Sequence, residues 1–351
     1  MPVARIFANL LLLLACGLFI ADSRATSHDR GEAEPTTDAV DKAAIKNATL
    51  LAPVVVSGTV AGPGLWRADR GEQTLWILGH LQPLPRGIKW DAEDVKATLD
   101  EVGALIEMPY ARIRANAGFW GRLALAPRVI GLRNDPQGRM LKERLPPDVY
   151  ARWESLRKRY LGRGHKAEKW RLLFAAEHLL DAAKRKSRLS GDSKVRKAIE
   201  RWAKKRKVER VESATEFLID DPKAMLTEFR ETPIDDLACF KTTLAWIEHD
   251  IDLMRARANA WADGDIRRLR ELSTRRPESA CVGSLLDNDL FRNRGIDDLG
   301  GQIRQTWLRV VDETLERQGS ALALLPMSSL LGEDNYLDEL ASRGFNITSP
   351  E

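Results

Sequence analysis

The feature that most constrains the fold is the position of the strand-like segments, which lie near the two ends of the sequence. Near the amino end, "GLWRADRGEQTLWILG" has two short apolar runs around a Gly-containing turn, a pattern typical of a β-hairpin. The following "WDAEDVKATLDEV" places Val95, Leu99 and Val102 at helical spacing, and "GALIEM" is typical of a short buried strand that ends at Glu107. A strand, a helix and a strand within about 35 residues predict a βαβ unit with a parallel pair of strands.

The middle of the sequence has a helical pattern instead. From about residue 146 to 272, apolar residues recur at helical spacing, and "PPDVYARWESLRKRYL" places four of them on one face: Val149, Trp153, Leu156 and Tyr160. A strand, "SALALLP", then precedes a helix and a final short strand. We therefore predict an α/β (α+β) domain at 58–351. Its central sheet is built from the N- and C-terminal segments, with a large helical insert or cap at about 146–275.

The first 25 residues have the layout of a secretory signal peptide. Arg5 precedes an apolar run, and the small-residue segment after it ends in Ser23-Arg24-Ala25, which predicts cleavage near Ala25. The run is short for a bilayer span of about 20 residues, which favours cleavage over a membrane anchor. A lipoprotein attached at Cys16 stays open as a minor alternative.

Export has consequences for the mature chain. Residues 26–57 are polar, with scattered Pro and Gly and no sustained period, and we interpret them as a flexible linker. No other segment is apolar enough to span a bilayer, so we expect a periplasmic or secreted protein that does not cross the membrane after cleavage. Two cysteines then remain, Cys239 and Cys281, and an oxidising compartment favours a disulfide between them over two buried thiols.

Several phrases, in this order and spacing, resemble the TraB/GumN family, which also includes the Tiki-type metalloproteases. The resemblance spans roughly Gly64 to Ile347. It rests on "GLWRADRGEQTLWILG", "LPRGIKWDAEDVKATLDEVGALIEM", "ANAWADGDIRRLREL", "LFRNRGIDDLGGQI" and "ALALLPMSSLLGEDNYLDELASRGFNI". It implies the family's fold and a metal-dependent hydrolase site.

The two metal-binding motifs implied by this resemblance have both lost their histidine. Where the family has Gly-x-x-His after the first core strand, this chain reads Gly79-His80-Leu81-Gln82. Where the family repeats the motif near the C-terminus, this chain reads Pro326-Met327-Ser328-Ser329. The acid after the second strand is retained as Glu107, and the resemblance also places Arg292 and Asn293 near the site.

These replacements weaken any metal site. A catalytic transition-metal site usually has three imidazole, thiolate or carboxylate ligands, whereas Gln82 and Ser329 offer only neutral oxygens. We expect no metal cofactor and lean against enzymatic activity. One alternative keeps a divalent metal: His80 lies on the same strand face as residue 82 and could be a shifted ligand with Glu107. The remnant cleft also leaves two readings of Arg292, as a clamp for an anionic ligand or as the partner of a buried acid.

A strongly basic segment lies inside the helical block. Residues 184–210 hold 13 Lys or Arg against 3 acids, including the run Lys204, Lys205, Arg206 and Lys207. The segment is either a solvated helix face or a basic patch that attracts an anionic envelope polysaccharide, lipid head groups or an acidic partner. Nucleic acid would suit the charge, but an exported protein seldom meets it, so we do not expect it as a partner.

Other polar combinations do not form known motifs. Glu177-His178 and Glu248-His249-Asp250 lack the second histidine of a helical zinc motif, so we interpret them as surface or half-buried helix positions. Three hypotheses remain: a non-catalytic binding protein of the bacterial cell envelope, a metal-dependent hydrolase or peptidase with shifted ligands, and a basic adaptor for anionic envelope polymer.

Overall fold

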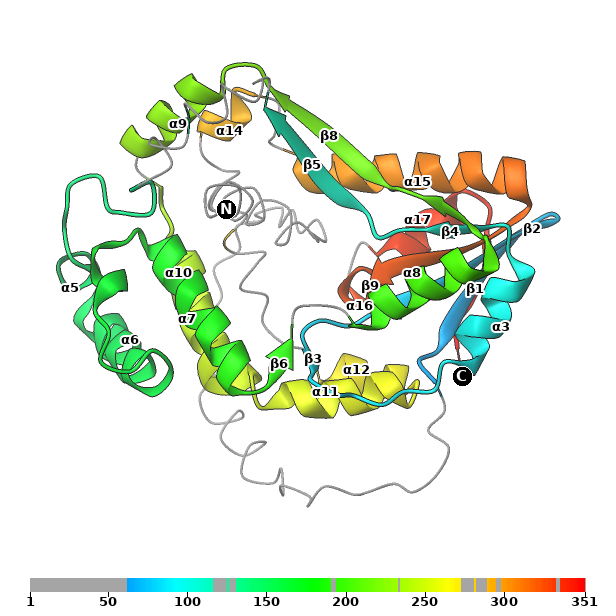
Figure 1. Cartoon of the computed structure of the whole chain (residues 1–351), viewed down its shortest axis with the longest axis horizontal. Helices are drawn as coiled ribbons and strands as arrows, with labels where there is room; N and C mark the ends of the chain where they lie inside the picture. Colours follow the sequence, from blue (N-terminus) through cyan, green and yellow to red (C-terminus); the bar gives the residue numbers. More distant parts are fainter. Residues whose placement is uncertain are drawn as a thin grey trace, which may run out of the picture.

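A computed structural model describes residues 62–115, 125, 131–190, 194–232, 234–272, 281, 289–294, 298–332 and 335–350. The predicted signal peptide, the Cys16 alternative and nearly all of the linker lie outside the described residues. The fold is mixed α and β, as predicted, with a central sheet and a large helical block (Figure 1). None of the helices in the described residues is both long and apolar enough to cross a bilayer.

The central sheet has six strands in the order β10-β1-β2-β9-β4-β7. The strands are β1 (Leu65–Arg70), β2 (Gln73–His80), β4 (Ala104–Ile106), β7 (Glu209–Val211), β9 (Ser320–Pro326) and β10 (Asn346–Thr348). The predicted hairpin is confirmed as β1 and β2, joined through Gly71 at φ +60°, a conformation that favours glycine. β10 and β2 run antiparallel to β1, whereas β2, β9, β4 and β7 run parallel.

The sheet is assembled from both ends of the chain, as the sequence predicts. β9, from the C-terminal part, inserts between β2 and β4 and is almost wholly buried, which explains its continuous apolar sequence. The βαβ prediction was therefore only half right. β2 and β4 are parallel and α3 (Glu93–Glu101) joins them, but they are not neighbours, because β9 lies between them.

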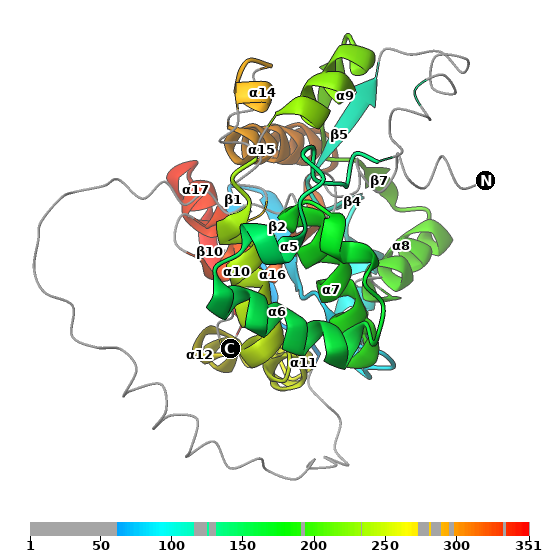
Figure 2. The ribbon, with the colours of Figure 1, turned by 90° about the vertical axis from the view of Figure 1, so that its left-hand side faces the viewer.

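Helices cover the sheet on both faces (Figures 1 and 2). The longest, α15 (Leu299–Gln318), packs on β2, β4 and β9 with Trp307 and Val311 among its buried residues. The Asp298 side chain caps its start by accepting from the Gly301 N–H at 3.1 Å. The other covering helices are α3, α8 (Lys194–Arg206), α11 (Leu253–Ala262), α12 (Ile266–Glu271), α16 (Met327–Leu331) and α17 (Tyr336–Ser342).

The helical block has its own buried cores. It contains α5 (Leu141–Arg144), α6 (Pro147–Tyr160), η1 (Lys166–Lys169), α7 (Leu172–Lys186), α9 (Pro222–Glu231), α10 (Leu237–Ala245), the π-helical turn η2 (Trp246–Asp250) and α14 (Asp289–Arg292). The predicted face of α6 is confirmed: Val149, Trp153 and Leu156 are buried, and Tyr160 is partly buried against the same core cluster. The Trp153 ring packs with its centroid 5.5 Å from that of Phe240.

The region from 146 to 275 is not wholly helical, which corrects the sequence analysis. It contains β6 (Leu189–Ser190), which pairs with β3 (Leu84–Pro85), and β8 (Ala214–Ile219), which pairs in parallel with β5 (Tyr110–Ala115). It also supplies β7 to the central sheet. β8 forms a strand rather than a helix because its burial alternates: Phe217 and Ile219 are buried, whereas Leu218 between them is exposed.

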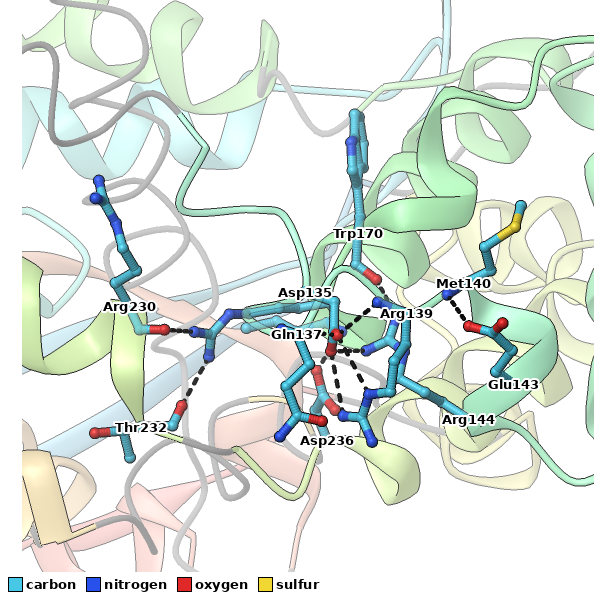
Figure 3. Close-up of polar contacts among 12 residues, drawn as sticks. Asp135, Gln137, Arg139, Met140, Glu143, Arg144, Trp170, Arg230, Thr232 and Asp236 are labelled. Carbon is cyan, nitrogen blue, oxygen red and sulfur yellow. Dashed lines mark hydrogen bonds and ion pairs between the residues drawn. The ribbon is translucent and has the colours of Figure 1, made fainter.

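A disulfide bond and a cluster of charged side chains stabilise the helical block. The expected disulfide is present between Cys239 of α10 and Cys281, whose Cα atoms lie 4.4 Å apart. A buried charge cluster centres on Asp135, which accepts hydrogen bonds from Arg139 and from the Arg144 Nη1 at 3.0 Å (Figure 3). Arg171, beside it, donates to backbone carbonyls of residues 229, 230 and 232 at the end of α9.

Candidate functional site

The carboxyl ends of four parallel strands meet at one edge of the central sheet, where open α/β sheets usually place their sites. β2 ends at His80, which pairs with Pro326 at the end of β9. The two motif segments identified in the sequence therefore lie side by side. A Cβ atom added to Gly79 would lie 2.5 Å from the Met327 Cε, so a larger residue at position 79 would force the Met327 side chain to shift.

A third sequence segment of the resemblance also reaches this edge. Trp261 of α11 is fully buried, and its indole Nε1 donates to the Gly79 carbonyl at 2.6 Å. Gly264, two residues after α11, has φ +73°, and a Cβ there would lie 3.1 Å from the Gly62 carbonyl oxygen. Both contacts explain why this segment carries a tryptophan and a glycine.

The two neutral motif residues have different surroundings. Gln82 is exposed, two residues beyond the end of β2, and its peptide bond to Pro83 is cis. It lines a cavity of about 250 Å³ between the loop at 81–90 and α8. Ser329 lies in α16 and is only 3% exposed, between Met327 and Leu330, which belong to the main core.

The Glu107 carboxylate, which follows β4, is held by a guanidinium. Its Oε1 forms a short ion pair with Arg210 of β7, and its backbone N–H donates to the Val211 carbonyl at 2.9 Å. Arg210 also lies 3.8 Å from Glu200 of α8, which in turn pairs with Arg196. The acid at the strand ends is thus the last member of a chain of alternating charges.

His80 is a buried neutral side chain. It is 3% exposed, and burial lowers its pKa to about 4, helped by the positive charge of Arg196. In the register of the sheet, Ile106 of β4 is level with Ala323 of β9 and Ile77 of β2, so Glu107 is level with residue 78 of β2. Glu107 is therefore two residues short of His80 along the strand direction and two strands away from it. Their backbones are therefore about 12 Å apart, at about 3.3 Å per residue and 4.8 Å per strand.

These residues do not fit a divalent metal. Two ligand positions carry neutral oxygens, and the one carboxylate is already neutralised by Arg210. His80 and Glu107 could share an ion only with both side chains fully extended toward each other. Within the described residues, no three His, Cys, Asp or Glu side chains gather in a way that could hold a metal ion.

The remaining site residues predicted from the sequence are not all brought to the strand ends. Arg292 and Asn293 are exposed at the end of α14, which packs against α9 rather than against β2 or β4. Figure 1 shows α14 beside α9, separate from the ends of these strands. Phe291, their neighbour in sequence, belongs to a core cluster of the helical block.

The basic run lies at the end of α8, which is packed rather than detached. Its buried residues Val195, Ile199 and Ala203 join the main core. Arg206 pairs with Asp100 of α3, whereas Lys204, Lys205 and Lys207 are exposed.

The sequence analysis missed the partner of Glu107. Arg210 lies in a three-residue strand shortly after the basic run, so the sequence analysis counted it with the cations of the basic segment. One signal was available: Glu209-Arg210-Val211 ends in a β-branched residue and is followed by the alternating strand β8.

The family model described as the TraB/PrgY/gumN family matches residues 64–349. No curated protein and no solved structure matches the chain. The matched range covers both motif segments, Glu107 and all six strands of the central sheet. The chain belongs to the TraB/PrgY/gumN family.

Proposed function

We propose that this chain is an exported, non-catalytic binding protein of the bacterial cell envelope, built on the TraB/PrgY/gumN scaffold. The observation that carries the proposal is the ion pair between Glu107 and Arg210. The Arg210 guanidinium supplies the positive charge that a metal ion would otherwise supply to the carboxylate at this edge, and it does not lose its proton at neutral pH. It therefore balances the acid without activating water.

The neutral side chains at the two motif positions support the same conclusion. A metal-dependent hydrolase needs ligands that hold the ion and leave one position open for water. Gln82 and Ser329 are weak neutral ligands. The His80 side chain is buried in the core, close enough to Arg196 for that positive charge to lower its pKa. Removing even a residue that supports a ligand usually costs 10–100-fold in affinity, and here two direct ligands are replaced.

Metal content and turnover of the purified mature protein test the proposal. We expect substoichiometric zinc, manganese and cobalt after dialysis, and no hydrolysis of a protein or peptide substrate when these ions are added. His80→Ala and Glu107→Ala should leave both readings unchanged. Near-stoichiometric metal that is lost in either variant, together with metal-dependent turnover, would establish the hydrolase with shifted ligands and overturn the proposal.

Export itself is part of the proposal and rests on the residues before Ala25. The layout of a charged start, an apolar run and a small-residue end supports cleavage there. Expression of the full chain with Ala25→Leu as a matched variant tests it. We expect the wild-type mature protein in the periplasm or medium with Thr26 as its first residue, and the variant unprocessed; retention of uncleaved wild type in the cytoplasm would contradict export.

A second candidate function is a basic adaptor for anionic envelope polysaccharide or lipid. The observation that favours it is the exposure of Lys204, Lys205 and Lys207 at the end of α8. Reversing these three lysines to Glu should abolish retention on vesicles that contain phosphatidylglycerol or on an acidic polysaccharide. The matched control reverses exposed lysines of the helical block, Lys142, Lys166 and Lys169, and changes net charge equally. Equal loss in both triple variants, or none in the first, would remove this candidate.

A further inference from the structure

A cavity of about 250 Å³ lies beside the first motif, between the loop at 81–90 and the first half of α8. The first motif contributes Leu81 and Gln82, the loop contributes Arg86 and Trp90, and β6 contributes Ser190. From α8, Lys194, Val195, Ala198 and Arg201 face it at the spacing of one helix face. Gln82 thus replaces a motif histidine and at the same time forms part of a built wall.

The cavity is lined by cations that no acid of the described chain neutralises. Three other arginines of the basic segment are paired: Arg196 with Glu200, Arg206 with Asp100, and Arg210 with Glu107. In the described part of the chain, by contrast, no carboxylate pairs with the three cavity cations, Arg86, Lys194 and Arg201. Among the described residues that line the cavity, none is an Asp or a Glu. The positive charge collects on one small concave surface, where it attracts anions.

The rest of the lining is apolar and aromatic. Leu84, Ile88 and Val195 form part of the wall, and Trp90 adds an aromatic side chain that is only partly buried. The Trp90 ring packs against the rings of Trp202 and Trp261, with centroids 5.9 Å and 5.7 Å away, and these contacts fix its position. The volume is below the roughly 300–1,000 Å³ of sites for larger ligands, so it accepts about one ring.

From these observations we infer that the cavity beside Gln82 binds a small organic anion, with a carboxylate or phosphate against Arg86, Lys194 and Arg201 and a ring-sized apolar body against Trp90. This inference rests on the proposed non-catalytic function, because it turns a former motif position into a binding wall. The Gln82 side-chain amide adds two N–H donors that can bind the anion.

Titration of the mature protein with four probes tests the charge and the body separately. The probes are phenyl phosphate, benzoate, inorganic phosphate and benzyl alcohol, added at constant ionic strength because salt screens exposed charges. Binding is followed by ligand-observed NMR and by tryptophan fluorescence. We expect phenyl phosphate and benzoate to bind with dissociation constants roughly in the millimolar range, inorganic phosphate more weakly, and benzyl alcohol not measurably.

Variants locate the binding. Arg86→Gln and Arg201→Gln should each weaken phenyl phosphate by about threefold to tenfold, between the effects of an exposed ion pair and a charge-assisted hydrogen bond. Gln82→Ala should weaken it less, and Trp90→Phe should remove the fluorescence change. Lys205→Gln is the matched control, because it removes one charge from the same helix outside the cavity and should change nothing.

Three results would overturn the inference: no binding of either organic anion, equal binding of benzyl alcohol, or the same weakening in Lys205→Gln as in Arg201→Gln. None of them bears on metal content or turnover, so the proposed function would stand. Conversely, metal-dependent hydrolysis would overturn the proposed function whatever the titrations give.

Discussion

Glu177 of α7 offers a sharp test of the reasoning about buried charge. The side chain is half-buried, and its pKa is raised from 4.5 to about 8 by burial and by the charge of Asp181 one turn away, despite Lys184 and Arg133 nearby. The folded protein therefore keeps this proton between pH 4.5 and 8, whereas the unfolded chain loses it. Because the folded state binds more protons in this range, its stability must fall as the pH rises through it.

The substitution Glu177→Gln removes the titration while keeping the shape of the side chain. A shift of about 3.5 pKa units corresponds to about 5 kcal/mol if fully realised. Since the carboxyl group is only half-buried and water can reach it, we expect about 2 kcal/mol of that amount. The variant should be more stable than wild type by about 2 kcal/mol at pH 9, and by less than about 1 kcal/mol at pH 5.

Urea unfolding followed by circular dichroism at pH 5, 7 and 9 measures this difference. Glu72→Gln serves as the control, because Glu72 is exposed in the turn of the β1–β2 hairpin and should not change the pH dependence. If Glu177→Gln and wild type lose stability in parallel between pH 5 and 9, the raised pKa of Glu177 is wrong, and the half-buried carboxyl group is solvated like the control.

Three further predictions concern the scaffold. Asp135→Asn should destabilise the protein by about 3 kcal/mol, because Arg144 loses its buried partner. Burial raises the pKa of Asp135, but hydrogen bonds from Arg139 and the charge of Arg144 outweigh it and lower the pKa below 3.8. In wild type this stabilisation should therefore persist down to about pH 4 and be lost below it, which acid unfolding measures. Reduction of Cys239–Cys281, or its replacement by two serines, should cost about 4 kcal/mol for its loop of 42 residues, measured by urea unfolding with and without reductant. Trp261→Phe should cost about 1–3 kcal/mol, because the Gly79 carbonyl loses its buried donor, and thermal unfolding measures it.

Local pattern was sufficient for the elements near the ends of the chain. The hairpin of β1 and β2, helix α3 and strand β4 were all predicted, because each shows its own period within a few residues. The disulfide followed from an even count of cysteines and the inferred compartment. The juxtaposition of the two motif segments followed from the family resemblance, and it is realised by the pairing of His80 with Pro326.

Local pattern was not sufficient where pairing partners are distant in sequence. Arg210 and Glu107 are 103 residues apart, and they meet only because β7 lies beside β4 in the sheet. A strand of three residues has no measurable period, so its sequence gives only a weak signal for a strand and none for the strand beside it. The exclusion of Arg292 from the strand ends has the same origin, since the packing of α14 on α9 depends on the whole helical block.

The basic segment shows how one charge excess can have several uses. Thirteen cations against three acids over 27 residues suggested a single basic patch, but the structure divides the cations by their surroundings. Arg196, Arg206 and Arg210 are paired with acids: Arg196 within α8, Arg206 with α3, and Arg210 of β7 with Glu107 after β4. Lys194 and Arg201 instead line the cavity beside Gln82. A third group, Lys204, Lys205 and Lys207, is exposed at the end of α8. Because a paired cation contributes little field beyond its partner, only the second and third groups can attract an anion, and only the second does so in a concave, partly apolar setting where charge and shape act together.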